Sequence, residues 1–320
     1  MASKYLDASV NGCTGITGIS ISDSHVAPAS NAFIVAEDST LTVGDSIEVF
    51  MGYVGNSPKM FSGYVKNIEV REPERQYSIT AANAMTRATD YFLASSTPDN
   101  PFTRNHITAE NLVGQLLAIC GLTNYGYDAT SFTFGINTDV EVNLTSIYDY
   151  CHFIGGILAW HLYADINGKA WFVNRRPHPM AGDVSIATLT ENEILEINYT
   201  RSDRDLRNRV VVYGSEGIHA DKSASSPYVP AGLWRTVVVS APGIIDTQSM
   251  ATQSAIYNLD LLNRLTEHVS VSIIGDPSIN CRDVVTINRP TIGVTGDWYV
   301  YSCEHNWSKE GYITNLELRI

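Results

Sequence analysis

The chain has 320 residues, of which 44% are hydrophobic and 17% charged, and its net charge is −13. This length favours two or three domains, and an acidic chain without Lys/Arg clusters is a poor candidate for wrapping nucleic acid or binding an anionic membrane. With so few charges, the protein must either solvate itself with Ser, Thr and Asn or cover much of its surface in an assembly. We favour the assembly.

The first 30 residues lack the basic start and apolar run of a signal peptide. The longest apolar stretch, residues 154–164, is too short to span a bilayer. We therefore expect folding in a cytoplasm. The cysteines are far apart, odd in number and free of any Cys-x-x-Cys pair, which predicts reduced, buried thiols; they are Cys13, Cys120, Cys151, Cys281 and Cys303.

The first 95 or so residues are predicted to form an antiparallel β meander. Residues 46–51 and 76–81 alternate apolar with polar side chains, and residues 60–70 form a longer strand between them. The Gly/Asn/Ser/Pro stretch at 55–58 supplies a turn.

The middle of the chain is predicted to be mixed. A helix is expected from Thr108, as its N-cap, to Gly121, and a second, short helix from about Thr145 or Ser146 to Gly155-Gly156. Strands at residues 157–164 and 169–174 flank Asn167-Gly168, which is the strongest short signal for a β-hairpin.

The last third is predicted to be β again with one inserted helix. Strands are expected at residues 209–213, 269–274, 283–288, 298–306 and 312–320, and the helix at 247–268. Residues 215–232 are rich in Ser, Ala, Pro and Gly, which predicts a mobile loop that becomes ordered only against a neighbouring subunit or the spike. Deletion of residues 221–226 is therefore expected to spare folding yet weaken assembly.

Two segments far apart in the chain are similar. Residues 44–49 (Gly-Asp-Ser-Ile-Glu-Val) resemble residues 282–287 (Arg-Asp-Val-Val-Thr-Ile). Each precedes a turn and then a strand with an aromatic residue, Phe-Ser-Gly-Tyr-Val at 61–65 and Gly-Asp-Trp-Tyr-Val at 296–300. This weak repeat predicts two similar β units in one chain.

The colinear order of these elements over residues 40–320 resembles the phage tail baseplate hub family, also called late control protein D-like. One departure is that the late strand opens with Arg282-Asp283 where the family pattern has Gly-Asp, which puts the shape of that turn in doubt. The resemblance implies a mainly β, α+β fold. Two tail-tube-like antiparallel β-barrels (residues 1–95 and 191–320) would flank an inserted α/β domain (residues 96–190).

The function that the resemblance implies is a structural hub without catalytic activity. Three chains would form a pseudo-hexameric ring that joins the tail tube to a central spike or tip protein and contacts tape measure and wedge proteins. The ring would be assembled in the host cytoplasm, would reside in the virion without a membrane, and would pass DNA without binding it specifically. The alternatives left open are a tail-tip cell-wall hydrolase and a carbohydrate-binding receptor-recognition protein.

The sequence predicts no catalytic, cofactor or metal site. No phosphate loop, Gly-x-Ser-x-Gly or His-Glu-x-x-His motif occurs. Weaker candidates are each better explained as structural: the Cys151-His152 pair, a two-ligand Cys303/His305 metal site, a core His161, the carboxylates of Asp203 and Asp205, and sugar-stacking aromatic clusters at 148–150 and 298–301.

The acidic charge suggests a role for the channel wall. An acidic wall repels phosphates and keeps DNA moving, whereas a basic wall would grip it. We therefore predict that acids exceed bases in the lumen, with Glu48, Glu69 and Asp283 as candidates. The alternative is that the acidity only keeps the free subunit soluble.

Overall fold

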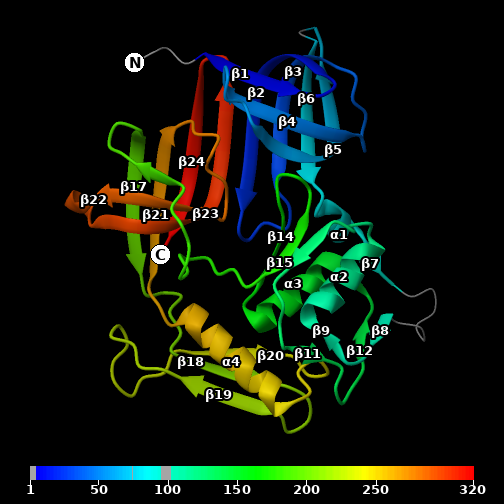
Figure 1. The fold of residues 1–320 in the computed structure, drawn as a ribbon, viewed down its shortest axis with the longest axis vertical. Coiled ribbons are helices and arrows are strands. Elements are labelled where there is room, and N and C mark those ends of the chain that lie inside the picture. Colours follow the sequence, from blue (N-terminus) through cyan, green and yellow to red (C-terminus); the bar gives the residue numbers. More distant parts are fainter. Residues whose placement is uncertain (1–4, 74, 95–101) are drawn as a thin grey trace.

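The computed structural model describes residues 5–73, 75–94 and 102–320, and it is mainly β (Figure 1). Strands from both ends of the chain join in one sheet, which occupies the upper half of the view. The helices and several short strands lie below it. Among the described helices, none is both long and apolar enough to cross a bilayer.

The first β unit contains six strands in the order β1-β4-β5-β6-β3-β2. Their bounds are β1 Leu6–Val10, β2 Cys13–Ser24, β3 Asn31–Ser39, β4 Ser46–Tyr53, β5 Lys59–Arg71 and β6 Gln76–Asn83. Alternate residues such as Ile34, Ile47 and Ile79 are fully buried in one core, as expected for a sheet with one covered face. The predicted meander is confirmed, and β1–β3 extend it.

The second β unit contains the last strands of the chain. Its members are β16 Ala187–Leu189, β17 Ile194–Ser202, β21 Thr266–Ile274, β22 Val284–Arg289, β23 Val294–Ser308 and β24 Gly311–Arg319, with a 3₁₀ turn η1 at Pro290–Ile292. Their pairing order is β17-β21-β24-β23-β22-β16. A separate core that includes Val271, Trp298 and Leu316 lies under them.

The two units match residue by residue. The order β2-β3-β6-β5-β4 in the first corresponds to β17-β21-β24-β23-β22 in the second. Ile47 lies opposite Gly63, and Val285 lies opposite Trp298 at the equivalent place. Two register shifts also coincide: one interrupts β2 and β17 near their starts, and another interrupts β5 and β23. A third, between Val49 and Phe50 of β4, has no counterpart in β22. The predicted repeat is therefore confirmed as a structural repeat. Among the described strands, no pairing closes either unit into a barrel.

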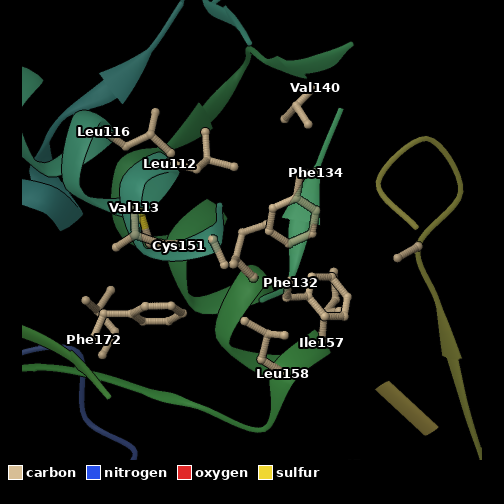
Figure 2. Close-up of a cluster of buried hydrophobic side chains, with 14 of the residues drawn as sticks. Leu112, Val113, Leu116, Phe132, Phe134, Val140, Cys151, Ile157, Leu158 and Phe172 are labelled. Atoms are coloured by element: carbon tan, nitrogen blue, oxygen red, sulfur yellow. The ribbon is translucent and has the colours of Figure 1, made fainter. Parts of the chain in front are cut away.

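The middle region covers the lower right of the view. Its strands are short: β7 Phe92–Leu93, β8 Phe102–Arg104, β9 Ile107–Thr108, β10 Tyr125–Tyr127, β11 Thr133–Phe134, β12 Val140–Val142, β13 Thr145–Ser146, β14 His161–Ala164 and β15 Ala170–Val173. Its helices are α1 Thr86–Asp90, α2 Ala109–Ile119 and α3 Ile147–Leu158. Figure 2 shows leucines of α2 packing with Phe132, Phe134 and the end of α3.

The local predictions for this region are mostly confirmed. Ser146 caps α3 by accepting a hydrogen bond from the amide of Asp149 at 3.0 Å. The Asn167-Gly168 turn joins β14 to antiparallel β15. Thr108, predicted to cap α2 with its side chain, does not do so and instead accepts a hydrogen bond from the Asn111 side chain at 2.8 Å.

The segment between β17 and β21 is an insertion that leaves the β unit. It contains β18 Arg209–Tyr213, β19 His219–Ser223, β20 Thr236–Ser240 and α4 Gln248–Leu262. Val210, Val212, Ala251 and Ala255 belong to the same core as the middle region, so the insertion packs with that region (Figure 1).

Two predictions about this insertion are wrong in part. The helix expected at 247–268 ends at Leu262, because residues 266–274 alternate buried Val269, Val271 and Ile273 with polar residues and form β21. The loop expected at 215–232 contains β19, which pairs along the whole of β18. Deleting residues 221–226 would remove three of the five residue pairs between β18 and β19, so it would not spare this sheet.

Candidate assembly surfaces

The structure does not assemble the weak catalytic candidates. Cys151 is fully buried in the middle core, and burial raises the pKa of its thiol. His152 is exposed and stacks on Tyr148, with ring centroids 5.6 Å apart. The two neighbours therefore point to different environments, as expected for adjacent helical residues. A buried thiol with a raised pKa is a poor nucleophile.

Cys303 and His305 do lie together, with 3.1 Å between Sγ and Nε2. Both are buried, and the imidazole is already occupied: Nε2 lies 2.9 Å from the Ile279 carbonyl, and Nδ1 lies 2.8 Å from the Tyr312 hydroxyl. Within the described residues, no group of three potential metal ligands occurs. The pair is best explained as a satisfied polar network in the core.

The other candidates also have structural roles. Asp203 binds Arg235 at 2.7 Å in an exposed turn, and Asp205 is exposed beside it. Trp298 and Tyr299 are almost fully buried, so neither can stack a ligand that arrives from solvent. The geometry at these positions supports no cleavage or sugar-binding site.

The two β units are joined by the pairing of β2 with the second half of β23. Seven antiparallel pairs run from Gly18–Ser308 to Ser24–Ser302. Residues that point to the core side of this junction are well covered: Ile19, Ile21 and His305 are each no more than 4% exposed. This intrachain junction shows that two such β units can join by antiparallel pairing of one strand from each.

A polar clamp anchors the middle region beneath the junction. The Arg282 guanidinium donates to both carboxylate oxygens of Asp23, at 2.6 and 3.2 Å, and to Nε2 of His161 at 3.0 Å. His161 also stacks on His25 with ring centroids 3.8 Å apart, and Nδ1 of His25 lies 2.8 Å from the Tyr299 hydroxyl. The clamp joins β2, β14 and the start of β22.

Burial controls the protonation of this clamp. It lowers the pKa of His25 to about 3 and that of His161 well below the usual range, and the nearby Arg282 charge lowers both further. Neutral His161 can accept from Arg282, and neutral His25 adds no second cation beside it. His161 was predicted to be a core or interface histidine, which is confirmed. The sequence offered no signal for Asp23 or His25.

The three predicted lumen residues occupy different settings. Glu48 is exposed and binds Lys59 at 3.2 Å, and Glu69 is exposed and binds Arg71 at 3.3 Å. Asp283 is half-buried, where its carboxylate accepts from the Asn280 amide at 2.7 Å and closes a turn. Burial raises the pKa of Asp283. In the first unit, the Asp45 carboxylate accepts a hydrogen bond from the Thr42 amide at 2.8 Å, as Asp283 does from Asn280.

The face of the sheet opposite the cores is mainly polar. Along the central strands, most residues that alternate with buried ones are small or polar; these include Ser20, Ser22, Ser270, Ser272, Ser302, Glu304, Asn306, Asn315 and Glu317. Phe33, Val35 and Ile313 are apolar exceptions on this face. Glu69 and Glu304 hold equivalent positions on β5 and β23, opposite Ser78 and Asn315. The lumen candidate Glu69 therefore has a counterpart in the second unit.

The chain was compared with known proteins. The YQBQ-like family model matches residues 182–319, which is less than half of the chain. No curated protein matches in sequence. A tail protein from Neisseria meningitidis has a similar structure, with 12% identity and a TM-score of 0.73, over 99% of this chain and 97% of the other.

Two further structures are similar over nearly the whole chain. The 43 kDa tail protein of prophage MuSo2 from Shewanella oneidensis has a TM-score of 0.66 at 13% identity, over 98% of this chain and 97% of that protein. An E. coli component of the type VI secretion system, itself described as similar to tail proteins of bacteriophage T4, has a TM-score of 0.60 at 8% identity, over 98% and 76%. The chain therefore has the fold of phage tail proteins, as the order of its elements suggested.

Proposed function

We propose that this chain is a structural hub of a phage tail or a related injection machine. Three copies would form a ring of six similar β units that joins the tail tube to a central spike or tip. The observation that carries the proposal is the residue-level match between the two β units, because two equivalent units per chain let a threefold ring present six similar edges. The shared fold with phage tail proteins supports it.

The hub would be a virion component without enzymatic activity of its own. Its partners would be the tail tube protein and the spike or tip protein, with tape measure and wedge proteins as further contacts. The division into residues 1–95, 96–190 and 191–320 would separate two ring-forming regions from a stabilising region. By its packing, the insertion between β17 and β21 also belongs to the stabilising region, and β16 belongs to the second ring-forming region. The burial of Cys151, Trp298 and Tyr299 favours this function over a tail-tip hydrolase or a carbohydrate-binding protein.

The open polar face would line the channel. It combines Ser, Asn and Thr with Glu48, Glu69 and Glu304. The bases beside two of these acids are paired, Lys59 with Glu48 and Arg71 with Glu69, and a base whose charge is paired holds DNA phosphates less strongly. Glu48 lies on the same face of the first unit, because its strand neighbours Ile47 and Val49 are buried in the core. Asp283 would contribute less, because its carboxylate is engaged in a turn.

Native mass spectrometry of the purified chain, alone and with candidate tail tube and spike proteins from the same source, tests this function. A trimer that binds both partners is the expected result. Monomers that bind neither partner, together with peptidoglycan clearing in a zymogram or saturable binding to a glycan array, would replace the hub with one of the alternatives.

A further inference from the structure

Among the described residues, the sheet has unpaired strand edges at β1, β16, β17 and the second half of β5, and the last two concern the junction between the β units. One is the outer edge of β17, which pairs only with β21. The other is the outer edge of β5 at residues 67–71, because β4 covers only the first half of that strand. Unpaired edges present free amide and carbonyl groups and are ready templates for another strand.

The structural repeat identifies these two edges as a matching pair. β17 is the equivalent of β2, and residues 67–71 of β5 are the equivalent of residues 302–306 of β23. Inside the chain, β2 of the first unit pairs with β23 of the second. The free edges are their counterparts in the other unit: β17 in the second unit corresponds to β2, and β5 in the first corresponds to β23. Six strands separate β5 from β17 in the order of the sheet, so the two edges do not pair with each other within one chain.

We infer that β17 of one chain adds antiparallel to β5 of a second copy, in the register of the intrachain junction. The inference rests on the proposed ring and specifies its interface. Ser20–Asn306, Ser22–Glu304 and Ser24–Ser302 are opposite in the intrachain junction. Transfer through the repeat predicts three interchain pairs, which are Asn198–Arg71, Thr200–Glu69 and Ser202–Asn67.

Burial supports this register. His305 is 3% exposed within the intrachain junction, whereas Val70, its equivalent on the free edge, is 51% exposed. The new pairing would place Tyr199 opposite Val70, as Ile21 lies opposite His305. An aromatic residue opposite a β-branched residue is a favourable cross-strand pair.

Polar chemistry agrees as well. In the intrachain junction Glu304 accepts a hydrogen bond from Ser20 at 3.4 Å. At the equivalent positions Glu69 would face the side-chain amide of Asn198, which is also a donor. The contact is head-to-tail, because each chain offers β17 on one side and β5 on the other. Such contacts form a closed ring when the rotation between neighbours is a whole fraction of a turn, as in the proposed trimer.

A disulfide experiment on the full-length chain tests the register. The Glu69→Cys/Thr200→Cys double variant should give covalent oligomers that end at the trimer under oxidation. The matched control is Glu69→Cys/Ser270→Cys, because Ser270 lies on the same face one strand further in. Since Ser270 is opposite Asn198 and not Thr200, it would lie about 12 Å from Glu69 of the second copy, two strand spacings across and two residues along. The control and both single variants should stay uncrosslinked.

Val70→Lys in the crosslinking background should lower the yield by about tenfold or more, which corresponds to 1.4 kcal/mol of lost affinity. Val54→Lys, at a valine that is 67% exposed away from both edges, should leave the yield unchanged. A trimer by mass without the 69–200 crosslink would overturn this interface but keep the ring. A chain that neither crosslinks nor forms a trimer with its partners would overturn the proposed function itself.

Discussion

The two β units build one turn from different residues. In the first unit Gly44 donates to the Val65 carbonyl and the Val65 amide donates to Asp45, both at 2.9 Å. In the second unit, the Arg282 amide donates to the Val300 carbonyl and the Val300 amide donates to the Asp283 carbonyl, both at 2.8 Å. Gly44 has φ +97° and Arg282 has φ +80°, so the turn keeps its left-handed residue although glycine is absent.

This difference shows what the second unit gains from an unfavourable backbone. A left-handed conformation costs a residue with a side chain about 1–2 kcal/mol. The Arg282 side chain offsets that cost because it binds Asp23 and His161 and lies over the Tyr163 ring, 4.2 Å from its centroid. The first unit needs no such anchor, since its turn holds no other region in place. Arg282-Asp283, which stands where the family pattern has Gly-Asp, thus adds side-chain contacts but leaves the backbone hydrogen bonds of the turn unchanged.

Removal of Asp23 should have the largest effect on stability. Asp23→Asn would leave the buried Arg282 charge uncompensated, which should lower the free energy of unfolding by about 3 kcal/mol. Chemical denaturation measures this loss. The Asp23→Asn/Arg282→Gly double variant copies the first unit's glycine, leaves no unpaired charge and should recover part of the loss. If it is no more stable than Asp23→Asn alone, the ion pair does not account for the arginine.

The turn itself can be tested at both positions. Gly44→Ala should cost about 1–2 kcal/mol from backbone strain alone, because a Cβ there meets no atom within 4 Å. Arg282→Ala should cost more than Arg282→Gly by a similar amount, since only glycine relieves the positive φ. Thermal unfolding of these three variants gives the comparison. Equal stabilities for Arg282→Ala and Arg282→Gly would show that the second turn relaxes.

The clamp should also respond to acid. The folded pKa of His25 is about 3, below its ordinary value of 6.5, so the neutral imidazole stabilises the fold above pH 6.5 and that contribution is lost as the pH falls from 6.5 towards 3. His25→Gln should flatten the decline by at most about 1.4 kcal/mol per pH unit. His219→Gln, at an exposed histidine, is the control. Parallel pH profiles for His25→Gln and the parent would contradict the burial argument.

Local patterns explain which parts of this fold could be predicted. A signal that involves only a few neighbouring residues can be read from the sequence. The strands at residues 46–51 and 76–81 and the hairpin at Asn167-Gly168 are of this kind, and each appears as expected. β19 could not be found, because Ala220 is its only well-buried apolar residue and its pairing with β18 is a tertiary effect. The Asp23–Arg282 contact joins residues 259 positions apart, so no sequence spacing indicates it.

The smallest effect should come from the other prominent ion pair. Arg209 and Asp221 also form a bidentate pair, in which Nε donates to Oδ1 at 3.0 Å and Nη2 donates to Oδ2, but on the open surface of β18 and β19. Water solvates both partners there, so Asp221→Asn should leave the midpoint of thermal unfolding unchanged within error. The same substitution at Asp23 has a large expected effect although the bond geometry is similar. If Asp221→Asn lowered the stability as much as Asp23→Asn, hydrogen-bond geometry rather than burial would determine the strength of these pairs. The buried clamp would then contribute no more to stability than an exposed ion pair.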